Sequence, residues 1–200
     1  DGMVNLFSEL GCEKVVMGGQ TMNPSTEDIL RACISVPAKN VFVFPNNKNI
    51  IMAAEQAVNL ATDRKIIVIP TRTIPQGISA ALNFDPTLDA DELAETMKAA
   101  AKSVLTGQIT FAARDSDFDG KDIKEGQILA MNEDKLSFVS EDISSAALEL
   151  ASEIADGKHP EFITLYYGDS VEEADAAKLA DSISEKFTDA EVNIVDGGQP

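Results

Sequence analysis

Three short segments rich in amide and hydroxyl side chains could bind an anion or a protein partner. They are GGQTMNPS (18–25), PNNKN (45–49) and PTRTIPQG (70–77), and each follows an apolar run. Helix N-termini together with cations suit a carboxylate or a phosphate, and Lys48 and Arg72 stand out in an acidic chain. The candidate residues for ligand or partner binding are Gln20, Thr21, Asn23, Ser25, Asn46, Asn47, Lys48, Asn49, Thr71, Arg72, Thr73 and Gln76.

A purely structural role is the alternative for the same side chains, because short polar residues cap helices and shape turns. Ser25 and Asp28 have the spacing of a capping box, and Asn23 before Pro24 offers another N-cap. The polar residues of the third segment, in contrast, have no obvious helix to cap. Both interpretations stay open on these residues alone.

Other patterns associated with chemistry are missing or incomplete. Neither G-x-G-x-x-G nor G-x-x-x-x-G-K-[ST] occurs, so this region is not expected to hold ATP. Residues 115–126 place aspartates as in an EF-hand, but Gly126 stands where the bidentate glutamate belongs, which favours a hairpin turn over a weak surface cation site. His159 is the single histidine and has no nucleophile motif near it. We therefore predict no metal ligand and no catalytic residue.

The elements that must position the three polar segments are strands alternating with helices. The predicted strands are residues 14–17, 40–44 and 65–69, and the predicted helices are residues 3–10, 25–34, 49–61 and 77–84. The strands are unbroken apolar runs, which is typical of strands buried on both faces of a parallel sheet. Ligands of such sheets bind outside the carboxyl ends of the strands, where the polar segments fall.

The second half of the chain has a different pattern. Short strands separated by turns predict an antiparallel meander over residues 108–139, and helices and strands alternate again over 143–195. We therefore predict an α/β fold of two lobes. The lobes are a parallel βαβ lobe (1–84) and a mixed α/β lobe (107–200), joined by an acidic helix (85–106).

Composition restricts the possible partners. The net charge is −18, from 34 acidic and 16 basic side chains, which disfavours nucleic acid and anionic lipid surfaces. No apolar run approaches the roughly 20 residues of a membrane span. Two cysteines without a C-x-x-C pair indicate a reducing compartment, and we expect a cytoplasmic protein. Because the chain opens on a helix-like segment and stops just after a strand-like one, we expect a fragment of a longer protein.

At GGQTMNPSTEDIL, PNNKNI and PTRTIPQG, and on through TGQITFAARDSDFDG to the final GGQP, the sequence resembles the carboxy-terminal region of the ATP-binding component of bacterial fatty acid kinase. This family is called FakA, and also YloV or dihydroxyacetone-kinase-like. The resemblance covers essentially the whole chain. It implies that ATP and magnesium belong to an amino-terminal domain absent here, and that this region needs no cofactor of its own.

The resemblance also implies a partner and a fold. In that family the carboxy-terminal region engages FakB, which carries the fatty acid that is phosphorylated to acyl phosphate for phospholipid synthesis. The region is also similar to the DegV fold of FakB itself, whose loop hydroxyls hold the lipid carboxylate. Thr21 and Ser25 match those positions, whereas PNNKN departs from the serine-rich pattern. A homodimer is one option for the full-length protein.

The resulting hypothesis is a partner-docking region of a fatty acid kinase that does not transfer phosphate by itself. One alternative is a domain that itself binds a fatty acid, carboxylate or phosphate in the strand-end cleft. Another is a dihydroxyacetone-kinase-like substrate domain, for which His159 is poorly placed because it lies outside the three polar segments.

Overall fold

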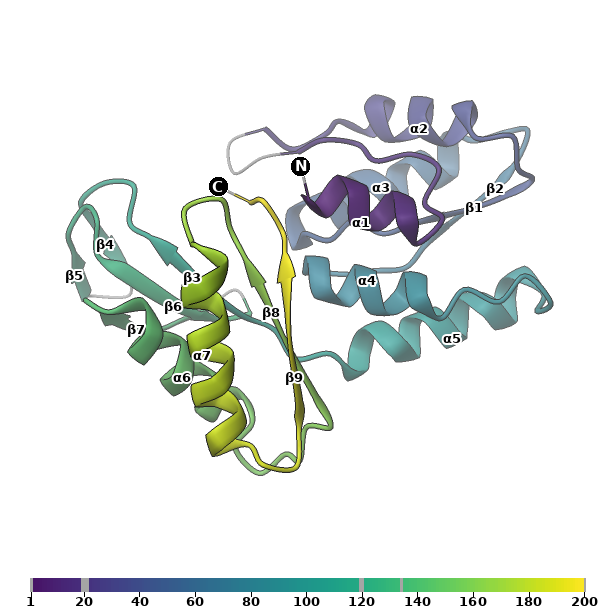
Figure 1. Cartoon of the computed structure of the whole chain (residues 1–200). Helices are drawn as coiled ribbons and strands as arrows, with labels where there is room; N and C mark the ends of the chain where they lie inside the picture. Colours follow the sequence, from purple (N-terminus) through teal and green to yellow (C-terminus); the bar gives the residue numbers. More distant parts are fainter. Residues whose placement is uncertain (1, 19–21, 119–120, 134, 200) are drawn as a thin grey trace. The chain divides into compact units, whose positions relative to one another are not determined.

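The computed structural model describes residues 2–18, 22–118, 121–133 and 135–199 (Figure 1). The chain divides into two compact units. The amino-terminal unit is Val4–Leu105, and the carboxy-terminal unit is Thr106–Pro200 together with Asp1–Met3.

In the amino-terminal unit a pair of parallel strands carries helices on both faces. Its elements are α1 (Gly2–Glu9, which begins in the other unit), α2 (Thr26–Ser35), β1 (Asn40–Val43), α3 (Lys48–Leu60), β2 (Lys65–Val68), α4 (Ile74–Leu82) and α5 (Ala90–Ser103). β1 and β2 pair in parallel, with Val43 opposite Val68. Strands buried between helices need apolar side chains on both faces, as the unbroken runs of β1 and β2 predicted.

Two hydrophobic clusters lie on the two faces of this strand pair. Val41 and Ile66 pack with α2 and α3 around the fully buried Ala54 and Ala57. On the other face, partly buried side chains of β1 and β2 pack against α4 and α5, and Met97 is only 1% exposed. Figure 1 shows the resulting order of helices, strands and helices. The acidic helix α5 thus packs within the amino-terminal unit.

One predicted strand does not form. Residues 14–17 are extended but belong to no sheet among the described residues, and Val15, Val16 and Met17 are 38%, 39% and 64% exposed. The prediction of a buried strand here is wrong. The run of three apolar residues at 15–17 favours an extended backbone, but it does not specify a neighbouring strand with which to pair.

The carboxy-terminal unit combines antiparallel and parallel pairing. Its elements are β3 (Gly107–Phe111), β4 (Ser116–Phe118), β5 (Lys121–Ile123), β6 (Ile128–Asn132), β7 (Lys135–Ser140), α6 (Ile143–Ile154), β8 (Phe162–Tyr167), α7 (Glu173–Lys186) and β9 (Glu191–Asp196). β3, β6 and β7 form the predicted antiparallel sheet, and β8 pairs with β9 in parallel. The EF-hand-like segment forms the β4–β5 hairpin, whose tip lies outside the described residues. The mixed α/β fold class is confirmed.

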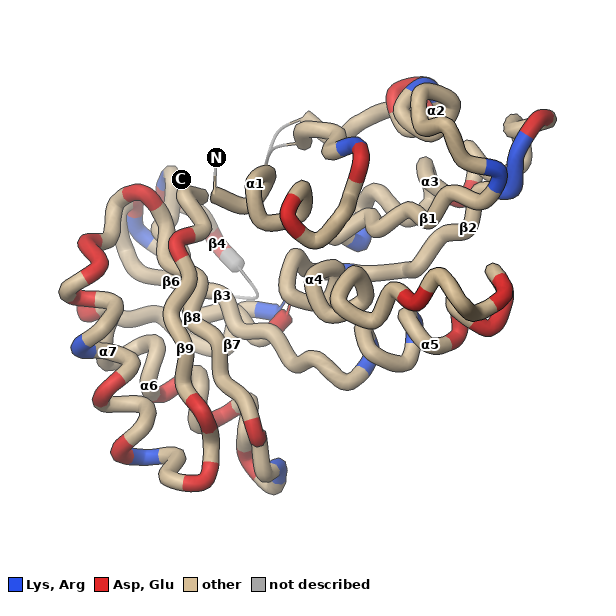
Figure 2. Tube along the Cα trace, turned by 45° about the vertical axis from the view of Figure 1, so that its right-hand side comes forward, with Lys and Arg blue, Asp and Glu red and all other residues tan. Residues whose placement is uncertain are grey.

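Charge is distributed very unevenly between the two units. Residues 4–105 carry 9 basic and 11 acidic side chains, whereas residues 1–3 and 106–200 carry 7 and 23. Acidic positions accordingly line the elements of the carboxy-terminal unit, α7 among them (Figure 2). The three polar segments identified from the sequence lie in the amino-terminal unit, which is the nearly neutral one. In the part of the chain that the structure describes, no helix is both long and apolar enough to cross a membrane.

Candidate functional site

The second and third polar segments meet at the carboxyl ends of β1 and β2. The hydroxyl of Thr71 donates a hydrogen bond to the Asn46 side-chain oxygen (Oγ1 to Oδ1, 2.8 Å), and the Asn46 backbone N–H donates to the same hydroxyl (3.0 Å). Thr71 is completely buried and Asn46 is partly buried, so both bonds are partly removed from water. We call this pair of hydrogen bonds the Asn46–Thr71 lock. It ties together two segments that are 25 residues apart in the chain.

Gln76 fixes the backbone next to this lock. Its side-chain oxygen accepts a hydrogen bond from the Arg72 backbone N–H (2.8 Å), and the Gln76 residue is only 7% exposed. The next residue, Gly77, lies directly against Asn46, and a Cβ added there would overlap the Asn46 amide. The third segment is therefore held from inside by its own buried side chains.

Several predicted site residues cap helices. Ser25 and Asp28 form the predicted capping box, with the Ser25 hydroxyl accepting from the Asp28 N–H at 3.1 Å. Asn47 accepts from the Asn49 N–H (2.9 Å) and begins α3. Thr73 caps α4 by accepting from the N–H three residues on, so the expectation that this segment caps no helix is wrong. The sequence does contain a signal for this helix start, because a threonine two residues before a proline fits an N-cap.

The remaining predicted residues are at the surface or outside the described residues. Lys48 is the first residue of α3 and is exposed, as are Asn49, Arg72 and Asn23. Gln20 and Thr21 lie outside the described residues. The second and third segments thus present two exposed cations, Lys48 and Arg72, on a backbone that the Asn46–Thr71 lock and Gln76 hold in place.

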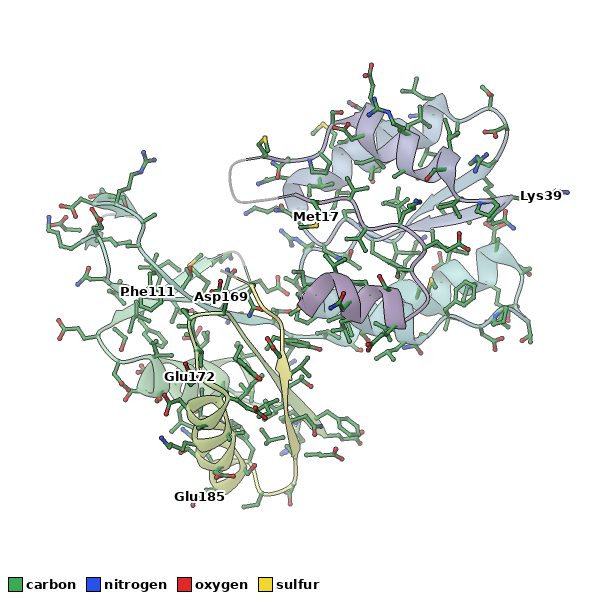
Figure 3. The ribbon with its side chains drawn as sticks, turned by 45° about the horizontal axis from the view of Figure 1, so that its top comes forward. Met17, Lys39, Phe111, Asp169, Glu172 and Glu185 are labelled. Carbon is green, nitrogen blue, oxygen red and sulfur yellow. The ribbon has the colours of Figure 1, made fainter. Side chains whose placement is uncertain are left out.

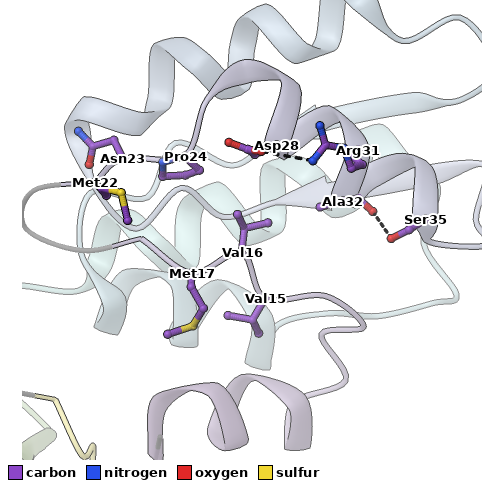
Figure 4. A pocket seen from close by; sticks show the side chains of 10 residues that line it. All are labelled: Val15, Val16, Met17, Met22, Asn23, Pro24, Asp28, Arg31, Ala32 and Ser35. Carbon is purple, nitrogen blue, oxygen red and sulfur yellow. Dashed lines mark hydrogen bonds and ion pairs between the residues drawn. The ribbon is translucent and has the colours of Figure 1, made fainter.

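A shallow hollow of about 580 Å³ lies beside the first polar segment. Extended residues Val15, Val16 and Met17 form one wall and α2 forms another (Figure 4). The residues that line it are Val15, Val16, Met17, Met22, Asn23, Pro24, Asp28, Arg31, Ala32 and Ser35. Of the predicted site residues that the structure describes, only Asn23 lines this hollow. The sequence did not reveal this hollow, because the pattern of residues 14–17 predicts a strand inside a sheet.

Two charged side chains, Asp28 and Arg31, line this hollow. Hydrogen bonds from Ser25 hold the pKa of the Asp28 carboxyl below its ordinary value, with a smaller contribution from Arg31 (Nη1 to Oδ1, 3.6 Å). Burial raises the pKa of the Cys33 thiol, which is the behaviour of a core cysteine rather than of a reactive thiolate. Among the described residues, no group of three histidine, cysteine, aspartate or glutamate side chains could hold a metal ion.

The second GGQ sequence has a structural role at the end of the carboxy-terminal unit. The Gln199 side-chain amide donates to the Tyr166 carbonyl of β8 (2.9 Å), and the Gln199 backbone carbonyl accepts from the Asp169 N–H (2.9 Å). Gly168 and Gly197 leave no space for a Cβ because Gln199 packs directly on both. This GGQ turn therefore closes the end of the parallel pair β8–β9.

Comparison with known proteins identifies the family. A family model for the carboxy-terminal region of FakA-like fatty acid kinase proteins matches residues 1–200. The chain belongs to this family. The resemblance to FakA is thus confirmed.

Relatives of this FakA-like chain are longer than the chain itself. Protein YloV of Bacillus subtilis (strain 168) is 44% identical over 200 residues, which are 100% of this chain and 36% of YloV. An uncharacterized protein of Staphylococcus aureus (strain USA300) is 36% identical over the same share of each chain. The chain therefore spans about a third of the length of these relatives.

The fold of this FakA-like region is also similar to that of a solved fatty acid kinase protein. The Streptococcus pneumoniae Fatty Acid Kinase B3 protein, solved loaded with linoleic acid, superposes with a TM-score of 0.59 and 19% identity. The match covers 86% of this chain and 69% of that one. At this identity the likeness concerns the fold alone, and it confirms the predicted DegV-like α/β fold.

Proposed function

We propose that this region docks the fatty-acid-carrying partner of a fatty acid kinase, so that a kinase domain elsewhere in the longer protein phosphorylates the fatty acid to acyl phosphate. ATP and magnesium would be held by that other domain, and the acyl phosphate would feed phospholipid synthesis in the cytoplasm. The observation that carries the proposal is the match to the FakA-like carboxy-terminal family along residues 1–200.

Docking in this proposal uses the surface formed by the second and third polar segments. Lys48 and Arg72 are exposed there, and partly buried hydrogen bonds hold the adjoining backbone. A surface prepared in this way loses little conformational entropy on binding, which favours recognition of a folded partner. Positioning is itself a catalytic contribution, because a displacement of about 1 Å can reduce a rate roughly 10²-fold.

The test is a double substitution, Lys48→Ala with Arg72→Ala, in the full-length protein. We expect a raised KM for a linoleic-acid-loaded FakB-type carrier, with little change in the thermal unfolding midpoint, because both side chains are exposed and interactions of exposed charges contribute at most about 1 kcal/mol. The matched control is Lys39→Ala with Lys102→Ala, which removes two exposed cations of the same unit. Lys39 lies at the amino-terminal end of β1, away from the strand ends that carry the polar segments (Figure 3). Equal KM values for the two double variants would contradict the assignment of this surface.

A second candidate function is direct binding of a fatty acid or another small carboxylate or phosphate. The hollow of about 580 Å³ beside α2 favours it, because its walls are mostly apolar and Arg31 stands at its rim. Mass spectrometry of the purified chain under native conditions distinguishes the two functions. Co-purified lipid supports this second candidate, whereas a lipid-free chain that binds the loaded carrier supports docking.

The dihydroxyacetone-kinase-like alternative has less support. It would require a histidine to hold a ketone substrate covalently, and His159 is exposed in the loop between α6 and β8. That loop belongs to the carboxy-terminal unit, whereas the polar segments belong to the other unit.

A further inference from the structure

The Asn46–Thr71 lock joins two loops at a cost in free energy, which comes from an unusual backbone conformation and from a buried polar group. Asn46 has a φ of 55°, in the left-handed region that residues other than glycine seldom adopt. Thr71 is 0% exposed, so its hydroxyl must be hydrogen-bonded inside the protein. Among the described residues, Thr71 and Gln76 are the buried polar side chains, and both serve these loops. Backbone strain and buried polar groups in one place are typical of a functional site.

The lock acts on the backbone immediately beside the two exposed cations. Asn46 is followed by the N-cap Asn47 and then by Lys48. Thr71 is followed directly by Arg72, whose N–H is bonded to Gln76. The lock therefore lies next to the backbone of both cations, and neither of its residues belongs to the hydrophobic clusters on the two faces of β1 and β2.

We propose that Asn46 and Thr71 are positioning residues, whose hydrogen bonds hold Lys48 and Arg72 at the spacing that the fatty-acid-loaded carrier recognises. This inference rests on the proposed docking function and adds a mechanism to it. The exposed side chains contact the carrier, and the lock keeps them ready in the unbound protein, so that binding does not have to order the two loops.

The variants that test this inference differ from the wild-type protein only at Asn46 or Thr71. Thr71→Val keeps the shape of the side chain and removes the hydroxyl, whereas Thr71→Ser keeps the hydroxyl. Asn46→Gly removes the amide and also relieves the left-handed backbone, so this variant is expected to fold. The control is Ser79→Ala, which removes a part-buried hydroxyl bonded to the Ala100 carbonyl of α5, outside the polar segments.

Each variant is measured in the full-length protein with a linoleic-acid-loaded FakB-type carrier as the varied substrate. We expect Thr71→Val and Asn46→Gly to raise the KM of the carrier roughly tenfold, a loss of about 1.4 kcal/mol, and to change kcat little. Thr71→Ser restores the wild-type KM, and the Ser79→Ala control keeps it. If the Thr71 hydroxyl served only to stabilise the fold, Thr71→Val and Ser79→Ala would both lower the unfolding midpoint, and neither would raise the KM.

A wild-type KM in the folded Asn46→Gly variant overturns the inference, and this variant alone decides if Thr71→Val does not fold. The double variant Lys48→Ala with Arg72→Ala separates this failure from failure of the docking proposal. If that double variant raises the KM and Asn46→Gly does not, the surface docks the carrier without the lock. If the double variant also leaves the KM unchanged, the docking surface itself is wrongly assigned.

Discussion

Gly77→Ala is the substitution that tests the geometry of the lock most sharply. In an isolated helix, replacing glycine by alanine stabilises by at most about 1 kcal/mol. Here the added Cβ would overlap the Asn46 amide, which would have to move away. The two effects have opposite signs, so the sign of the measured change decides which of them dominates.

The structure predicts that the overlap dominates. Displacing the Asn46 amide breaks its hydrogen bond with Thr71. It also leaves a fully buried hydroxyl without an acceptor, at a cost of about 1–3 kcal/mol. The helix term offsets up to about 1 kcal/mol of this cost, so we expect Gly77→Ala to destabilise the protein by about 1–2 kcal/mol.

Urea unfolding of the 200-residue chain, followed by circular dichroism, measures this change directly. The same substitution is made in an Asn46→Gly background, where no amide occupies the space. There we expect Gly77→Ala to be neutral or stabilising, which gives a coupling free energy of about 1–3 kcal/mol between the two positions. A stabilising effect in the wild-type background, or an equal cost in both backgrounds, would refute this account of the packing.

Three further predictions concern the rest of the fold. Met97→Ala removes a side chain that is 1% exposed and should lower the free energy of unfolding in urea by about 2–5 kcal/mol. The control Met52→Ala, at a 68% exposed site, should change it by less than about 0.5 kcal/mol. Equal effects would contradict the packing of α5. Gly107→Ala would press on side chains of α6 and should cost about 1–3 kcal/mol, and an unchanged urea midpoint would contradict that contact. The pKa of Asp28 is lowered in the fold, so its ionised form stabilises the fold above the unfolded pKa of about 3.9, and this stabilisation is lost as the pH falls through the folded pKa. Asp28→Asn should therefore make the stability depend less on pH below about 4. Identical acid titrations of the two proteins by circular dichroism would count against the capping box.

Much of the amino-terminal unit could be predicted because its signals are local. The capping box of Ser25 and Asp28 is encoded within four residues, and the apolar runs of β1 and β2 need only their own composition. The positions of the polar segments followed from the rule that loops at the carboxyl ends of parallel strands lie at one edge of the sheet.

The lock could not be predicted because it depends on strand register. Asn46 and Thr71 each lie three residues beyond Val43 and Val68, which are paired partners in β1 and β2. A slip of one residue would remove this match, and composition does not fix the register. The error at residues 14–17 has the same origin, since an apolar run does not identify a pairing partner.

The central claim is that this region binds a fatty-acid-loaded carrier protein through Lys48 and Arg72. Isothermal titration calorimetry of the 200-residue chain with a linoleic-acid-loaded FakB-type carrier tests it most directly. We expect saturable binding that weakens at least roughly tenfold in the Lys48→Ala and Arg72→Ala double variant and stays unchanged in the control with Lys39→Ala and Lys102→Ala. Absence of binding by the folded chain, or equal affinity of the two double variants, would contradict the claim.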